Sequence, residues 1–130
     1  MILLLAATFL SGCATSESLL SKRGRGGNVF TCQAEYGQVY DEVLHIFKKE
    51  RLRVIRRDRK KGEIIGGDTI RFLNGGGRIA VFLHRRGPSD TKVEVHSEPF
   101  LLVPLPTYYI SARKRGLLIR EELQQAFGPA

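Results

Sequence analysis

Apolar side chains recur at three- and four-residue steps between Tyr36 and Glu50, which is the spacing of one face of a helix. The residues on this face are Tyr36, Val39, Tyr40, Val43, Ile46 and Phe47. Acidic residues stand near the start of the segment, and Lys48 and Lys49 stand near its end, where the helix dipole favours them. The pattern therefore predicts an amphipathic helix.

From Leu52 onward the pattern changes to a period of two, which is typical of strands with one buried face. Strands are predicted over residues 52–57, 63–73, 78–85 and 91–98, with a further short strand at 28–34 before the helix. Gly66 and Gly67 interrupt the segment 63–73 and indicate a bulge there. The run Asn74-Gly75-Gly76-Gly77 predicts a turn, because Asn and Gly tolerate positive φ.

The alternation also predicts how the strands pair. In one hairpin Arg85 pairs with Thr91, and in the other Leu73 pairs with Arg78. The cross-strand neighbours are then Leu83 with Val93, Val81 with Val95, Phe72 with Ile79, and Ile70 with Val81. One face of the sheet carries apolar side chains: Ile70, Phe72, Ile79, Val81, Leu83, Val93 and Val95. The other face carries polar ones: Arg71, His84, Lys92, Glu94 and His96.

The segment from Pro99 to Pro106 is apolar, but its prolines exclude a regular helix. Thr107 is placed to cap a last helix, and Gly116 in its middle is a candidate for a break. The apolar stripe of this helix is Tyr109, Ala112, Gly116, Ile119, Leu123 and Phe127. The element order predicts a single α+β domain over residues 28–130: a small antiparallel sheet of four to five strands with one face covered by two helices.

An apolar run from Ile2 to Leu10, broken only by Thr8, precedes these elements. A helix needs about 20 residues to cross roughly 30 Å of hydrocarbon, so this run is too short to span a membrane and has the length of a signal peptide's apolar part. It ends in Leu10-Ser11-Gly12-Cys13, which resembles the lipobox of bacterial lipoproteins. The resemblance implies a signal peptide over residues 1–12, cleavage between Gly12 and Cys13, and an anchor of membrane lipid on acylated Cys13.

The lipobox carries one departure and leaves alternatives. No Lys or Arg precedes Cys13, so we expect the natural start to lie upstream. The small residues before Cys13 also fit chance, or a buried helix. If the resemblance holds, the protein is lipid-anchored in the bacterial cell envelope. Ala14 then resembles the residue of lipoproteins sorted to the outer membrane, where the chain would face the periplasm of a Gram-negative host.

Residues 13–27 are rich in Ser and Gly and predict a flexible tether between the lipidated cysteine and the domain. The chain contains 21 Lys and Arg against 13 Asp and Glu, a formal charge of +8. Such a charge usually indicates nucleic acid. An exported, lipid-anchored chain meets anionic lipid or envelope polymer instead, so no nucleic-acid partner is expected.

Basic residues form three clusters that would make one anion-binding patch if they converge, the alternative being scattered solvated charge. The candidates are Arg53, Arg56, Arg57, Arg85, Arg86, Arg113, Lys114 and Arg115, the first three within the basic run from Arg51 to Lys61. A second candidate site is an apolar contact surface for an envelope protein complex, which would equally serve to close the core. Its residues are Phe100, Leu101, Leu102, Leu105, Tyr108 and Tyr109.

The sequence contains no recognisable catalytic motif, and we expect neither enzymatic activity nor a cofactor. His45, His84 and His96 share no ligand spacing, so no metal site is expected. Cys32, the other of the 2 cysteines, is predicted to be a buried thiol, with an intermolecular disulfide or a reactive site as alternatives.

The element order resembles that of small bacterial lipoproteins known only as a domain of unknown function. It is similar, more distantly, to the helix-on-sheet domains of the C subunit of the outer-membrane β-barrel assembly machinery. The likeness spans about residues 28 to 127 and is carried by Val39 and Val43, the step from Asp58 to Gly62 and Ile64, and Thr91-Lys-Val-Glu-Val. The segment 100–106 departs from those lipoproteins, which have a glycine-rich stretch there.

These observations predict a lipid-anchored, non-catalytic binding or structural accessory of the envelope. The alternatives are an envelope enzyme with an unrecognised site, or a basic nucleic-acid-binding domain if the lipobox is fortuitous.

Overall fold

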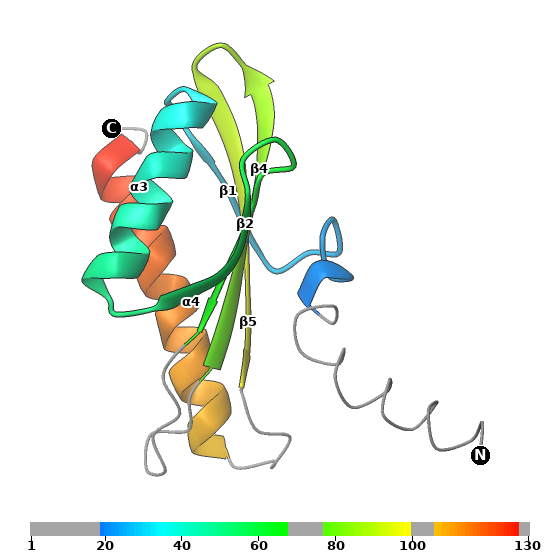
Figure 1. The fold of residues 1–130 in the computed structure, drawn as a ribbon, viewed down its shortest axis with the longest axis vertical. Helices are drawn as coiled ribbons and strands as arrows, with labels where there is room; N and C mark the ends of the chain where they lie inside the picture. The colour runs from blue at the N-terminus through cyan, green and yellow to red at the C-terminus, as the bar shows by residue number, and fades with distance from the viewer. Residues whose placement is uncertain (1–18, 68–76, 100–105, 128–130) are drawn as a thin grey trace, which may run out of the picture.

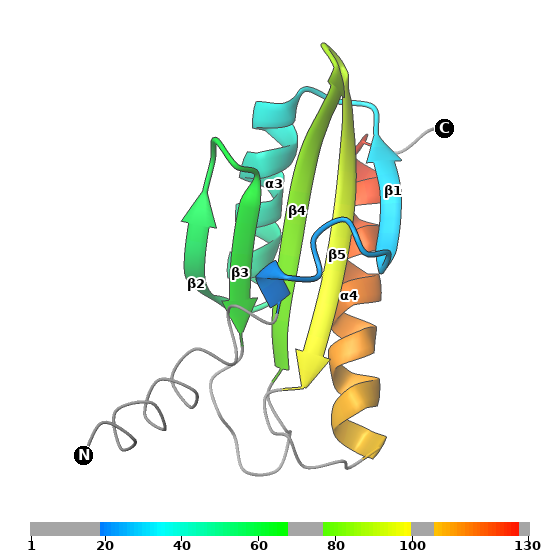
Figure 2. The ribbon, with the colours of Figure 1, turned by 90° about the vertical axis from the view of Figure 1, so that its right-hand side faces the viewer.

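The computed structural model describes residues 19–67, 77–99 and 106–127, which form one antiparallel sheet, two long helices and an N-terminal segment (Figure 1). The elements are β1 (Asn28–Cys32), α3 (Tyr36–Lys49), β2 (Arg53–Asp58), β3 (Glu63–Gly67), β4 (Gly77–Gly87), β5 (Asp90–Pro99) and α4 (Pro106–Phe127). The strand order in the sheet is β1-β5-β4-β3-β2, and all neighbours are antiparallel. The predicted α+β class, with two helices on one face, is confirmed (Figures 1 and 2).

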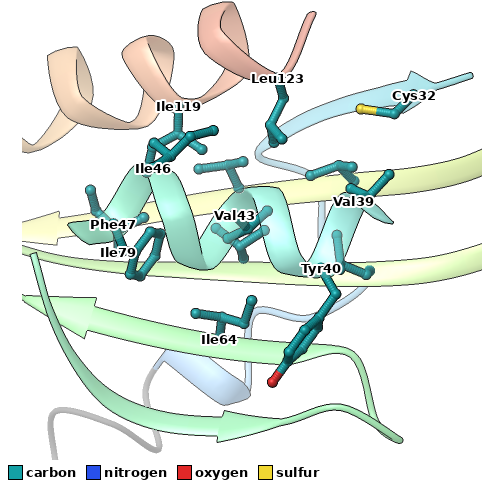
Figure 3. Close-up of a cluster of buried hydrophobic side chains, with 14 of the residues drawn as sticks. Cys32, Val39, Tyr40, Val43, Ile46, Phe47, Ile64, Ile79, Ile119 and Leu123 are labelled. Atoms are coloured by element: carbon teal, nitrogen blue, oxygen red, sulfur yellow. The ribbon is translucent and has the colours of Figure 1, made fainter. Parts of the chain in front are cut away.

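Helix α3 presents the predicted face to the sheet. Its buried residues are Tyr36, Val39, Tyr40, Val43, Ile46 and Phe47. Side chains from the two helices and the strands meet between the layers, where Ile64 and Ile79 of the sheet face Phe47 and Val43, and Ile119 and Leu123 descend from α4 (Figure 3). This apolar layer is the main core of the domain.

Helix α4 runs without a break through Gly116 and begins at Pro106, one residue before the expected cap at Thr107. Proline suits the first turn of a helix because its missing N–H has no partner there. A Cβ on Gly116 would stand 3.4 Å from Ser97 Oγ and 3.6 Å from Val95 Cγ1. These are ordinary contact distances, so α4 lies against β5 at Gly116 and the glycine does not mark the expected break.

The hairpin of β4 and β5 has the predicted register. Arg85 pairs with Thr91, Leu83 with Val93, and Val81 with Val95. The apolar members of these pairs are at most 3% exposed and face the helices. Alternation of apolar and polar residues was sufficient to predict this register, because a slip of one residue would have turned the polar side chains into the core.

The hairpin of β3 and β4 corrects the second predicted register. Arg78 pairs with Gly67 and not with Leu73, and Val81 pairs with Ile64 and not with Ile70. The two registers differ by an even number of residues, so both put an isoleucine on the same face, and alternation cannot distinguish them. The rest of the predicted strand 63–73 and the turn at 74–76 lie outside the described residues.

The choice of register follows from Phe47 of α3. A Cβ on Gly66 would lie 2.5 Å from Phe47 Cε2, and Phe47 is fully buried. The aromatic ring therefore rests on bare backbone at Gly66, which no other residue would allow. The expected bulge is found on the neighbouring strand, where the pairing of β2 with β3 shifts between Val54 and Arg56.

The N-terminal segment, residues 19–27, differs from the predicted tether because it packs on the face of the sheet opposite the helices (Figures 1 and 2). Leu19 is fully buried in a second cluster with Ile65, Ala80 and Phe82. Two leucines within the Ser- and Gly-rich stretch supply the apolar area for this docking. The tether prediction remains only for residues 13–18, which lie outside the described residues. Neither described long helix is apolar enough over its length to cross a membrane.

Candidate functional site

The N-terminal segment crosses one face of the sheet (Figure 2). Polar side chains of the central strands lie on that face. In one cross-strand row Glu63 of β3 lies opposite Phe82 of β4, which lies opposite Glu94 of β5. His84 and His96 are on the same face, since each is two residues from a member of this row. Glu94 is 1% exposed and both Glu63 and His96 are 7% exposed, so this face buries charge under the segment.

Glu94 is at the centre of the buried polar network. Its Oε2 accepts a hydrogen bond of 2.8 Å from the Gly24 amide and lies 2.6 Å from His96 Nε2. Its Oε1 lies 3.7 Å from His84 Nε2. Burial alone would raise the pKa of Glu94, but the hydrogen bonds from His96 and Gly24 and the charge of the histidines outweigh it and lower that pKa. Glu94 is therefore a carboxylate that holds the segment through a backbone amide.

Three glycines of the segment have the left-handed backbone that this path requires: Gly24, Gly26 and Gly27 have φ of 79°, 92° and 82°. A Cβ on Gly27 would also lie 2.6 Å from His96 Cε1, so the chain passes directly over that ring. Ion pairs join the segment to the sheet at both sides, from Lys22 to Glu98 at 2.5 Å and from Arg23 to Glu63 at 3.3 Å.

Beside this network, at the end of the sheet where the β2–β3 and β4–β5 hairpins turn, lies a hollow of about 450 Å³ that we call the basic hollow. Its lining residues are Arg23, Tyr36, Lys60, Lys61, Leu83, His84 and Arg85. They come from four places in the chain: the segment, α3, the loop between β2 and β3, and β4.

The loop that carries Lys60 and Lys61 is fixed against β4. Gly62 has φ of 68°, its carbonyl accepts a hydrogen bond of 2.8 Å from the Leu83 amide, and a Cβ there would lie 2.3 Å from Leu83 O. Asp58 Oδ1 accepts a bond of 3.0 Å from the Lys61 amide, which closes the turn. The sequence thus fixes both lysines near the end of β4.

Arg85 is oriented by Tyr36. Its guanidinium carbon stands 4.5 Å from the centre of the Tyr36 ring, and the Tyr36 hydroxyl donates a hydrogen bond of 2.5 Å to the Arg59 carbonyl. His84 completes the wall. Burial and the nearby charge of Arg23 lower the pKa of His84, so its imidazole is neutral at neutral pH.

The structure divides the predicted anion-binding residues and corrects the idea of a single patch. Arg85 joins Lys60 and Lys61 because the two hairpins turn at the same end of the sheet. Arg53, Arg56 and Arg57 are exposed along β2, at the edge of the sheet, with Arg56 Nε 3.6 Å from Glu63 Oε2. Arg86 is exposed at a register shift in β4.

The cluster on α4 lies elsewhere. Arg113 and Lys114 are exposed and Arg115 is half-buried. Arg113 lines a different hollow with Gly27, His96 and Ser97, on the side of β5 and away from the hairpin turns. The cluster on α4 is therefore separate from the basic hollow, whereas the basic run that ends at Lys61 and the pair Arg85-Arg86 each contribute residues to it.

Most of the other predicted site residues lie outside the described residues or have side chains that are not described. Gly12 and Cys13 precede the described residues. Phe100, Leu101, Leu102 and Leu105 lie between two described ranges, 77–99 and 106–127. Tyr108 and Tyr109 belong to α4, and their side chains are not described. Cys32 is fully buried as predicted, and burial raises the pKa of its thiol to about 11. Within the described ranges, no group of three His, Cys, Asp or Glu side chains is placed to hold a metal ion.

Sequence reasoning placed His84, Glu94 and His96 on one face but did not foresee that a segment covers them. The two-residue spacing of Glu94 and His96 in an alternating strand was the available signal for their contact. No protein-family model matches this chain, and no curated protein matches it either.

Proposed function

We propose that the protein is a lipid-anchored lipoprotein of the bacterial cell envelope that acts as a non-catalytic binding accessory. The observation that carries this proposal is the run Leu10-Ser11-Gly12-Cys13 after an apolar stretch. An acyl-anchored cysteine followed by a small domain needs no catalytic centre to localise a binding surface at a membrane.

The packing of the N-terminal segment supports a close position at the membrane. Leu19 is fully buried on the sheet and comes six residues after Cys13 in the sequence. A chain extends at most about 3.6 Å per residue, so the sheet stays within roughly 20 Å of an anchored Cys13. The proposed anchor therefore holds the covered face of the sheet and the basic hollow near the lipid surface.

The polar network supports a binding role over a catalytic one. Glu94 and His96 are 1% and 7% exposed and are hydrogen-bonded to each other and to the segment. Groups that satisfy each other under a covering segment stabilise the docked chain. The accessible chemistry of this region is the charge of the basic hollow, and charge recruits anionic partners.

The anchor is tested by metabolic labelling with a fatty-acid probe in a bacterial host, with the DNA upstream of the first codon retained. The comparison is between the unchanged chain, Cys13→Ser and the matched control Cys32→Ser. We expect the unchanged chain and Cys32→Ser to carry label and to fractionate with the membrane. Cys13→Ser should lose both, because Cys13 is the cysteine of the lipobox. An unlabelled, unprocessed, soluble chain would contradict the proposal and make nucleic acid the partner to test.

A further inference from the structure

We propose that the basic hollow binds a phosphate group, presented either by an anionic lipid headgroup or by a soluble phosphate ester. Four cationic side chains meet there: Arg23, Lys60, Lys61 and Arg85. The chemistry of the hollow is independent of the anchor, whereas supply by a membrane lipid rests on the proposed function.

The cations of the hollow are largely free to bind a ligand. Among the described residues, Lys60, Lys61 and Arg85 form no ion pair with a carboxylate. Arg23 is partly neutralised by Glu63 at 3.3 Å, and that carboxylate also faces Arg56. Positive charge on three side chains without a carboxylate partner attracts an anion more strongly than charge that is already paired.

The arrangement of donors suits phosphate. A guanidinium binds two phosphate oxygens through parallel hydrogen bonds, and a lysine supplies a compact charge to the same group. Arg85 is held over Tyr36, and the loop of the two lysines is fixed by Gly62 against β4, so the guanidinium and the backbone that carries the lysines are preorganised. Preorganised donors lose little conformational entropy on binding.

His84 adds a neutral polar group to the wall of the hollow. Its Nε2 is buried and has no hydrogen-bond partner among the described residues, since the 3.7 Å to Glu94 Oε1 is too long. This nitrogen is not exposed to the hollow, so His84 contributes the rest of its neutral ring to the wall. The acidic groups in the surroundings are Asp58, which accepts a backbone amide of the loop, Glu63, which pairs with Arg23, and Glu94, which is bonded to His96.

The membrane provides a local source of such a group. Arg23 follows the buried Leu19 by four residues, so the hollow and the start of the described chain are on the same part of the sheet. Anionic headgroups near an anchored domain act at high effective concentration, which makes a modest site sufficient.

The test uses the full chain carrying Cys13→Ser, so that binding does not depend on acylation. One variant adds Lys60→Gln and Lys61→Gln in the hollow. The matched control adds Arg113→Gln and Lys114→Gln, which removes the same charge from exposed positions on α4. The first probe is inorganic phosphate, and its binding is monitored by the amide resonances of residues 60, 61 and 85. A chloride titration of equal ionic strength is the control. The second is sedimentation with vesicles of phosphatidylcholine, with or without phosphatidylglycerol.

We expect phosphate to shift the resonances of the hollow, and the hollow variant to bind anionic vesicles about 25-fold more weakly, at roughly fivefold for each basic residue near an anionic surface. The control is expected to lose much less. Phosphate shifts with equal vesicle losses in both variants assign the ligand to a soluble phosphate ester. Equal vesicle losses without any phosphate shift overturn the proposal. Loss of fatty-acid label in the intact cell would instead contradict only the anchor.

Discussion

The two faces of the sheet are covered in different ways. On one face, α3 and α4 bury a continuous apolar layer that extends from Phe30 to Leu123. On the other, a nine-residue stretch, 19–27, covers a small cluster around Phe82 and a network centred on Glu94. Hydrophobic area stabilises the first face, whereas the second depends on a few apolar side chains and hydrogen bonds to one carboxylate. We therefore expect the first face to open only with global unfolding and the second to open locally.

The largest effect is expected from Phe47→Ala on the helix-covered face. Phe47 is fully buried and its ring rests on Gly66, so truncation leaves a cavity that backbone cannot fill. We expect a loss of about 3–5 kcal/mol in the free energy of unfolding, measured by urea denaturation. The matched control is Ile55→Ala, which is 47% exposed on β2 and is expected to cost less than about 1 kcal/mol. Equal losses would show that this layer does not dominate the stability.

A smaller and local effect is expected from Leu19→Ala on the other face. Leu19 is the buried apolar anchor of the segment, and its truncation weakens docking by about 2 kcal/mol. Hydrogen exchange of the Gly24 amide, which is bonded to Glu94, should then accelerate about 30-fold.

The same variant is compared by labelling of the Cys32 thiol, which is buried under the helices. We expect its labelling rate to stay near that of the unchanged chain, because the segment can open while the helices remain packed. If Cys32 labelling in Leu19→Ala accelerates as much as exchange of the Gly24 amide, the two faces unfold as one unit.

The smallest effect is expected from pH. The pKa of Glu94 is lowered from 4.5 in the folded state, so its stabilising contribution is present above that pH and is lost as pH falls through the lowered pKa. The pKa of His84 is lowered from 6.5, so the unfolded chain binds its proton first and stability also falls as pH drops below 6.5. Both groups therefore weaken the segment-covered face in acid.

Glu94→Gln and His84→Gln separate these two contributions. Glutamine keeps a hydrogen-bonding side chain of similar size but does not titrate. Urea denaturation over a series of pH values should show that His84→Gln flattens the slope just below pH 6.5, and that Glu94→Gln flattens it below pH 4.5. An unchanged slope in both variants would place the acid sensitivity elsewhere in the fold.

The sequence was sufficient to predict those elements whose apolar pattern fits only one arrangement. The face of α3 follows from its helical period, and the register of β4 with β5 follows from alternation, because a slip of one residue would turn polar side chains into the core. The register of β3 was not predictable from alternation, since Ile64 and Ile70 have the same parity and only the ring of Phe47 over Gly66 selects between them. A tertiary contact therefore selects one of the two β3–β4 registers that the local pattern allows equally.

The candidate site shows the same limit. Alternation placed His84 and Glu94 on one face, but the covering segment has only Leu19 and Leu20 as a signal within a polar stretch. Arg85 lies near Lys60 because the β2–β3 and β4–β5 hairpins turn at the same end of the sheet. This follows from strand order and not from sequence spacing. Clusters in sequence therefore identified the charge but not the place where it gathers.

Three of the arginines outside the hollow lie on β2, one of the two edge strands of the sheet. An edge strand offers unpaired backbone groups to any other strand, and charged side chains together with a bulge are the usual protection against such pairing. Arg53, Arg56 and Arg57 and the shift between Val54 and Arg56 supply both features. Copies of a chain anchored as proposed would meet often in the plane of the membrane, and this edge would then keep them from joining their sheets into aggregates.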